Sequence, residues 1–117
     1  MKIREIAELL KAEVPVCKDK IDEEVYSACA ADMMSDVLAY VKDQAVLITG
    51  LCNPQVVRTA EMMDIRCILL VRDKKPDSVI LDLAREKGIV ILCSPHRMYI
   101  ACGLLYKAGL SGGEHCV

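Results

Sequence analysis

One unit repeats three times after residue 44 and limits the folds open to this chain. It is a short apolar run, then turn-forming residues, then a segment of helical periodicity. The apolar runs are residues 45–49, 67–71 and 89–93. Strands that alternate with helices are typical of βα units with parallel strands, and runs that are apolar throughout indicate helices over both sheet faces. The sequence therefore predicts a three-layer α/β/α fold with a largely parallel sheet.

Capping residues place the helices between these strands. Asn53 suits an N-cap and Pro54 the first helical position. Gly88 and Gly109 each follow a helical segment and suit a left-handed helix stop. The predicted helices of this part cover residues 54–63, 76–87 and 97–107.

The first 44 residues are less regular. Pro15 has no N–H to donate, so the extended segment around it belongs at a sheet edge. Asp32 is suited to cap the helix that follows it. The elements predicted here are a helix over residues 2–11, an extended segment over 13–17, a strand over 25–30 and a helix over 33–41. No linker interrupts the chain, so we expect one domain over residues 1–110 and a frayed tail over 111–117.

Composition excludes several classes of function. The chain has neither Phe nor Trp and a net charge of −2, which argues against nucleic-acid binding. No uninterrupted apolar run exceeds five residues, and the N-terminus lacks the features of a signal peptide. The seven cysteines form no Cys-x-x-Cys pair and resemble reduced, buried thiols. We therefore expect a cytoplasmic protein with no membrane partner.

The order of these elements and several sequence segments resemble the DRTGG domain family over essentially the whole chain. The family takes its name from Asp-Arg after one strand and Thr-Gly-Gly after the next. These signatures fall at about Cys52-Asn53 and Val71-Arg72-Asp73, and both are absent. Besides the helix over residues 54–63, the segments that carry the resemblance are Leu47-Ile48-Thr49-Gly50, Cys67-Ile68-Leu69-Leu70-Val71, Lys75-Pro76-Asp77 and Ala84-Arg85-Glu86-Lys87-Gly88-Ile89.

The resemblance implies an α/β domain related to the N-terminal domain of HPr kinase. Such domains are usually joined to CBS domains, pyrophosphatases or phosphotransacetylases as a dimerising or regulatory part. Free-standing members accompany Fe-only hydrogenase and anti-sigma-like genes, which implies hydrogenase or signalling partners. A kinase activity is not expected, because the chain has no Gly-x-x-x-x-Gly-Lys-Ser/Thr motif. We therefore expect a non-catalytic regulatory or protein-interaction domain.

Three loops follow the predicted parallel strands, where ligands of open α/β sheets gather. Their free backbone N–H groups and cationic side chains suit a phosphate or carboxylate. An alternative function is therefore a small-molecule sensor for a nucleotide or another anion. Solvated turns and a simple helix cap would leave the same pattern. The predicted ligand-binding residues are Gly50, Cys52, Asn53, Arg72 and His96, with Lys74, Lys75 and Arg97 nearby.

Cysteines near the strand ends raise the question of a metal or a nucleophile. Cys29, Cys52 and Cys93 lie at or after strand ends, and His96 follows three residues after Cys93. Structural metal sites usually show closely spaced pairs of ligands, and the close pairs here are Cys93 with His96 and His115 with Cys116. As a nucleophile, Cys93 with His96 lacks an orienting third group. We therefore expect no catalytic residue, no metal and no cofactor, with the thiols filling space in the core.

The last predicted helix, residues 97–107, is apolar nearly all round, which indicates burial on more than one side. Two coverings for its second face are open, either the helix over residues 2–11 or a partner subunit. Hydrophobic residues make up 54% of the chain. We expect a homodimer, because so large an apolar share has to be covered. Met98, Ala101, Cys102 and Leu105 are predicted to face the sheet. The predicted interface residues are Tyr99, Ile100, Gly103, Leu104 and Tyr106.

Overall fold

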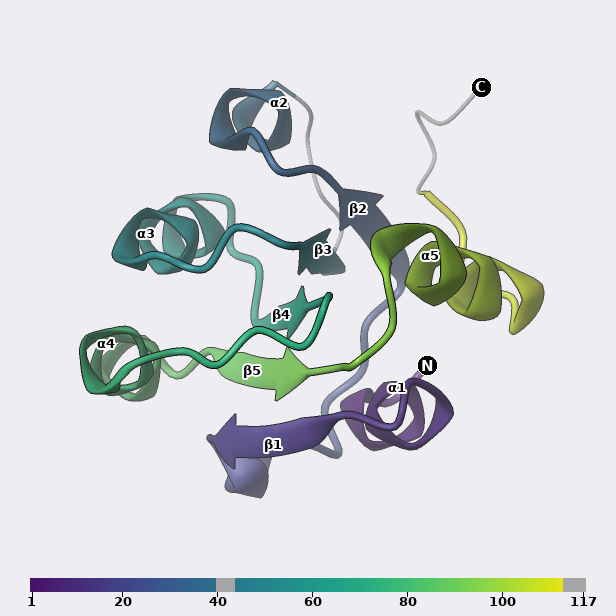
Figure 1. Cartoon of the computed structure of the whole chain (residues 1–117), viewed down its shortest axis with the longest axis horizontal. Coiled ribbons are helices and arrows are strands. Elements are labelled where there is room, and N and C mark those ends of the chain that lie inside the picture. The colour runs from purple at the N-terminus through teal and green to yellow at the C-terminus, as the bar shows by residue number, and fades with distance from the viewer. Residues whose placement is uncertain (40–43, 113–117) are drawn as a thin grey trace.

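A computed structural model describes residues 1–39 and 44–112, which form a five-stranded sheet between two layers of helices (Figure 1). The strand order is β1-β5-β4-β3-β2, with β1 antiparallel to β5 and the other pairs parallel. The predicted three-layer, largely parallel fold is confirmed. The strands are β1 (Glu13–Val16), β2 (Ser27–Ala30), β3 (Ala45–Thr49), β4 (Cys67–Leu70) and β5 (Val90–Cys93).

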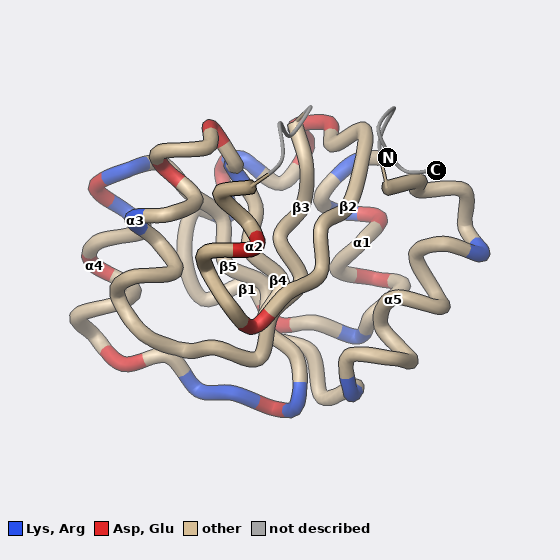
Figure 2. Tube along the Cα trace, turned by 90° about the horizontal axis from the view of Figure 1, so that it is seen from above, with Lys and Arg blue, Asp and Glu red and all other residues tan. Residues whose placement is uncertain are grey.

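Helices cover both faces of this sheet. In Figure 1, α2, α3 and α4 lie on one side, and α1 and α5 lie on the other. Lys and Arg are interspersed with Asp and Glu along the surface segments (Figure 2). The helices are α1 (Ile3–Leu9), α2 (Met34–Leu38), α3 (Pro54–Met62), α4 (Ser78–Lys87) and α5 (Met98–Lys107), and a 3₁₀ turn spans Lys18–Lys20.

The central strands β3, β4 and β5 are apolar except for Thr49 at the end of β3, because both their faces are buried. Ile48 and Leu69 pack into the core under α1 and α5. Leu47 and Ile68 pack into the core on the opposite face. A fully buried side chain of this size contributes about 1.5–3 kcal/mol relative to an exposed one. The two cores therefore hold the three strand ends in fixed positions for the loops that follow.

Local capping explains most helix boundaries. The Asn53 side chain accepts a hydrogen bond from Val56 N at 3.2 Å, and Pro54 takes the first helical position, as predicted. Asp77 caps α4 by accepting from Ile80 N at 3.0 Å, so this helix begins two residues later than predicted. Gly88 ends α4 with φ +69°, the left-handed conformation expected of it.

The N-terminal third differs more from the predictions. Asp32 does not cap α2, because Met33 holds the N-cap position without a side-chain hydrogen bond and the Asp32 carboxylate binds elsewhere. The helix ends at Leu38, and residues 40 and 41 of the predicted helix lie outside the described residues. β2 begins at Ser27, two residues after the predicted start. The edge position of β1 is confirmed.

At the C-terminal end, residues 113–117 of the predicted tail lie outside the described part of the chain. Before it, the carbonyl of Ser111 accepts a hydrogen bond from Ala28 N at 2.9 Å, which ties that residue to β2. Within residues 1–39 and 44–112, no helix has the length and apolar character needed to span a membrane.

Candidate functional site

A cluster of polar groups lies where three parallel strands end. Asp32 follows β2, Thr49 and Gly50 end β3, and Arg72 follows β4. Oδ1 of Asp32 accepts hydrogen bonds from Gly50 N at 2.8 Å and from the Thr49 hydroxyl at 3.3 Å. Oδ2 accepts from Nη2 of Arg72 at 3.2 Å. One carboxylate thus collects donors from the ends of two neighbouring strands.

The environment of this carboxylate favours its charged form. Thr49 and Gly50 are buried, whereas the Asp32 and Arg72 side chains are each 45% exposed. The Gly50 N–H is the largest cause that holds the pKa of Asp32 below its ordinary value of 3.8. Burial, the second-largest cause, opposes this shift, and the Arg72 guanidinium and the Thr49 hydroxyl lower the pKa further. Asp32 is therefore an anion at neutral pH.

Gly50 is the residue that lets Arg72 reach this position. A Cβ atom at Gly50 would overlap the Arg72 guanidinium, so a side chain there would displace it. The φ angle of Gly50 is not in the left-handed region, which leaves space as the reason for glycine. The guanidinium therefore lies directly against the backbone at the end of β3.

The loop after β4 has an unusual backbone for its sequence. Arg72 and Asp73 have φ angles of +64° and +57°, a conformation that costs a residue with a side chain about 1–2 kcal/mol. Hydrogen bonds from Arg72 N to the His96 carbonyl (2.7 Å) and from Asp73 N to the Ser94 carbonyl (3.0 Å) hold the loop. The resemblance to the family places the glycines of Thr-Gly-Gly at about these two positions. Two charged residues therefore adopt a turn that glycine would form without strain.

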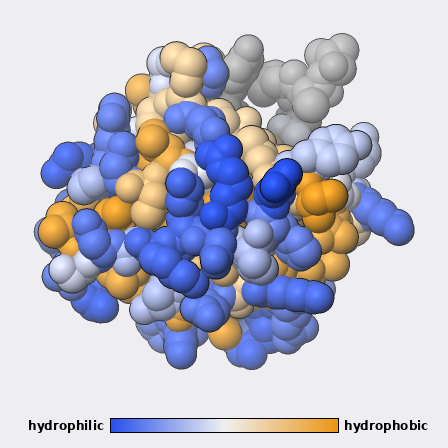
Figure 3. Space-filling model, viewed as in Figure 1, coloured by the Kyte–Doolittle hydropathy of each residue, from blue (hydrophilic) through white to orange (hydrophobic). Residues whose placement is uncertain are grey.

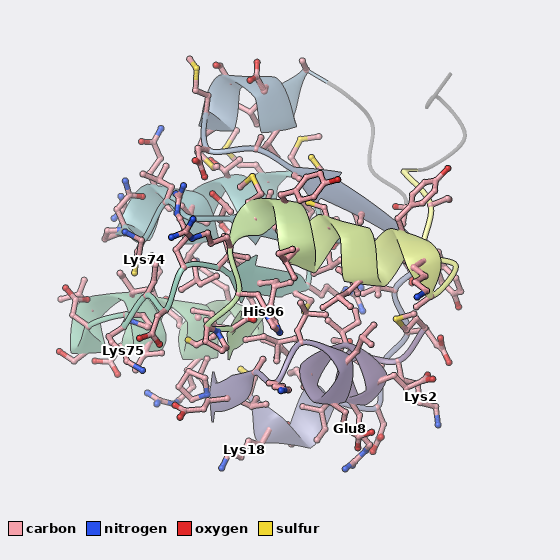
Figure 4. All side chains as sticks on the ribbon, turned by 45° about the vertical axis from the view of Figure 1, so that its right-hand side comes forward. Lys2, Glu8, Lys18, Lys74, Lys75 and His96 are labelled. Atoms are coloured by element: carbon pink, nitrogen blue, oxygen red, sulfur yellow. The ribbon has the colours of Figure 1, made fainter. Side chains whose placement is uncertain are left out.

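The structure brings together only part of the predicted ligand set. Gly50 and Arg72 are in contact, as described above. The side-chain oxygen of Asn53 caps α3, and His96 contributes its backbone carbonyl to the Arg72 loop. Figure 4 shows His96 beside the start of α5 and apart from Lys74 and Lys75. His96 therefore does not join Lys74 and Lys75 in one cluster, although its carbonyl binds the loop after β4.

The thiols near the strand ends lack the electrostatics of activated cysteines. Burial raises the pKa of Cys93 to about 11 and also raises the pKa of Cys52. Activated thiolates show the opposite shift. Within residues 1–39 and 44–112, no three His, Cys, Asp or Glu side chains lie close enough together to hold a metal ion. His115 and Cys116 lie outside the described residues.

Asp32 and Thr49 are the residues that sequence reasoning missed. Asp32 was interpreted as a helix cap because it precedes a helical segment. Asp32 lies two residues after the end of β2, as the three predicted ligand-binding loops lie after their strands. This position is the signal that points to the carboxyl edge of the sheet. Its partners are 18 and 40 residues away along the chain, so they follow only from the strand order.

A second feature, away from this cluster, is the outer face of α5. Ala101 and Leu105 are buried under the helix as predicted, and Met98 and Cys102 pack partly against the same core. On the outer side Tyr99 is 86% exposed, Ile100 46% and Tyr106 76%. Hydrophobic side chains gather on the right of Figure 3, over the region of α5 in Figure 1.

The helix α1 lies beside α5 in Figure 1 and covers only part of its second face. Leu104 packs partly against the core that contains Ile3 and Ile6 of α1. The alternative in which the N-terminal helix covers the whole second face is therefore wrong for Tyr99 and Tyr106. Gly103 lies between them with open space above its Cα.

Comparison with known proteins identifies the fold family. A family model of the DRTGG domain matches residues 5–107. No curated protein matches the sequence. The chain is similar to the crystal structure of the CBS and DRTGG domains of the regulatory region of Clostridium perfringens pyrophosphatase, complexed with its activator diadenosine tetraphosphate. The TM-score is 0.74 at 15% identity, over 99% of this chain and 52% of that chain, so this chain spans about half of the matched structure.

Proposed function

This chain belongs to the DRTGG domain family, and from that premise we propose that it is a non-catalytic regulatory or interaction domain that acts as a homodimer through the outer face of α5. The similar structure from the pyrophosphatase is part of a regulatory region, which supports the regulatory role. The observation that carries the dimer is the exposure of Tyr99, Ile100 and Tyr106 on one helix face. Apolar surface of this kind is typical of protein contacts.

The spacing of these residues suits pairing with a second copy. Tyr99 lies four residues before Gly103 and Tyr106 three residues after it, so all three share one helix face. In an antiparallel pair around a twofold axis near Gly103, Tyr99 of one copy meets Tyr106 of the other. Because Gly103 has no side chain, the two helix backbones can approach closely at the centre.

The chemistry of α5 also favours association. The helix contains no acidic residue, and Lys107 at its end is its one charged residue. A tyrosine buries about 150–250 Å² in a contact, so two per copy supply roughly half of the 800 Å² per partner of a standard interface. We therefore expect the two tyrosines of each copy to contribute a large part of the dimer contact.

Gly103→Glu tests the dimer without weakening the helix. Glutamate is a better helix former than glycine by about 1 kcal/mol, and its side chain would enter the open space at Gly103. We expect the wild type to sediment as a dimer at micromolar concentration and the variant as a folded monomer. Met62→Glu, at a residue 71% exposed on α3, is the control with the same charge change and should remain dimeric. A wild-type monomer at every accessible concentration contradicts the proposal.

A second candidate function is the sensing of an anionic small molecule at the strand ends. The observation that favours it is the position of Arg72. Its guanidinium lies against Gly50 at the end of β3, and its side chain is 45% exposed and therefore accessible to an anion. The similar pyrophosphatase region is complexed with a dinucleotide activator, which supports a nucleotide as one ligand class. The hydrogenase or signalling partners that the resemblance implies stay a prediction, and co-purification from the native cell tests it. The cytoplasmic location also stays a prediction from the sequence.

A further inference from the structure

We propose that Asp32 is an internal ligand of an oxyanion-binding site, and that it occupies the place of a phosphate or carboxylate group of a small molecule. The site consists of the Gly50 N–H, the Thr49 hydroxyl and the Arg72 guanidinium. This inference rests on the second candidate function and names the group with which a ligand must compete.

The three donors have the chemistry of an oxyanion site. A backbone N–H, a hydroxyl and a guanidinium are the donors that proteins use to hold phosphate and carboxylate oxygens. Here they converge on both oxygens of one carboxylate, at 2.8, 3.3 and 3.2 Å. Two of them, Gly50 N and Thr49 Oγ1, belong to buried residues at the end of a core strand. The site is therefore rigid on the side of the sheet.

The charges around the cluster agree with a site for one anion. Arg72 supplies one positive charge, and Asp32 balances it within the chain. The neighbouring carboxylate of Asp73 forms a separate ion pair with Lys75, with Oδ1 and Nζ 3.3 Å apart. With Asp32 in place a second anion is repelled. If the Asp32 carboxylate is removed, the same donors face the position that it occupied, and the charge of Arg72 is no longer balanced.

Asp32 differs from Thr49 and Gly50, which are buried, in being accessible. Its side chain is 45% exposed, so solvent and small solutes reach the carboxylate. It lies two residues before Met34, the first residue of α2. The backbone beside it is held by a hydrogen bond from Ala31 N to the Ile48 carbonyl at 3.0 Å. A ligand that displaces the carboxylate therefore acts on the short segment between β2 and α2, which gives the site a way to report its occupancy.

Asp32→Ala with inorganic phosphate as the probe tests this inference. The melting temperature is measured against phosphate concentration in a buffer that contains only chloride as the competing anion. We expect phosphate to bind the variant at least tenfold more tightly than the wild type. Asp36→Ala makes the same change in net charge on α2 and should respond like the wild type. The Asp32→Ala, Arg72→Ala double variant should lose the response. A parallel titration with acetate distinguishes a general carboxylate site from a phosphate site.

Equal responses of Asp32→Ala and Asp36→Ala overturn the inference, as does a response that survives the removal of Arg72. If Asp32→Ala does not fold, Asp32→Asn keeps the shape and one acceptor for Gly50 N–H but removes the charge. Its phosphate affinity should then exceed that of the wild type, and an unchanged affinity overturns the inference. Phosphate binding by Asp32→Ala, together with a wild type that binds no phosphate-bearing metabolite, supports the internal ligand and refutes the sensor function.

Discussion

Removal of the Asp32 carboxylate should destabilise the fold by an amount that the structure allows us to estimate. The hydrogen bond from Gly50 N–H to the charged oxygen, at 2.8 Å, is of a kind that contributes about 1.5–3 kcal/mol. The ion pair with Arg72 adds less than about 1 kcal/mol, because both side chains are 45% exposed and screened by solvent. Water replaces part of the lost contacts, so we expect Asp32→Ala to cost about 2 kcal/mol.

Thermal and urea denaturation in a chloride buffer measure this cost. An unfolding entropy of about 2.1 cal/mol/K per residue converts about 2 kcal/mol into a fall of about 8 °C in melting temperature for this chain. The difference should depend on pH in one direction. The folded-state pKa of Asp32 lies below its ordinary value, so its stabilisation is complete above about pH 4 and is lost as the pH falls through the folded-state pKa.

The wild type and Asp32→Ala should therefore differ by a constant amount from pH 6 to pH 7 and converge in acid. Two results would refute the reasoning. One is an unchanged melting temperature at pH 7, which would mean that water satisfies Gly50 N–H as well as the carboxylate does. The other is a difference as large at pH 2 as at pH 7, which would assign the effect to packing of the side chain rather than to its charge.

Two further substitutions test local parts of the fold. Asp77→Ala removes the acceptor for Ile80 N at 3.0 Å and should cost about 1 kcal/mol in urea denaturation, while Asp77→Ser, which keeps a capping oxygen, should cost less. Asp73→Gly should make the chain about 1 kcal/mol more stable than Asp73→Ala, because both variants lose the ion pair with Lys75 but only glycine relieves the φ of +57°. Equal stabilities of the two Asp73 variants would show that the left-handed turn stores no strain.

The parts of the fold that sequence predicts well depend on local chemistry. The strands β3, β4 and β5 follow from runs that are apolar at every position but Thr49, since both faces are buried. The start of α3 follows from Asn53 and Pro54, and the end of α4 from Gly88, because each cap depends on residues within one turn. These signals need no knowledge of which strands are neighbours.

The candidate site could not be predicted in the same way. Asp32 has the same local sequence context as a helix cap, and its true partners at Gly50 and Arg72 come close only because β2, β3 and β4 are adjacent. The outer face of α5 shows the same limit, since Leu104 packs against the core while Tyr99 remains exposed. Sequence periodicity places both on the second face of the helix, and only the position of α1 separates them.

The strained turn after β4 and the internal ion pair depend on the same residue, Arg72. Two glycines at positions 72 and 73 would adopt the left-handed turn without strain but would place no charge at the strand end. Arginine at position 72 accepts that strain and puts a cation against Gly50, where its charge needs a partner. Asp32 provides that partner from the neighbouring strand end and fills the position that an anion would take. The residue that strains this turn is therefore also the one whose charge the proposed anion site requires.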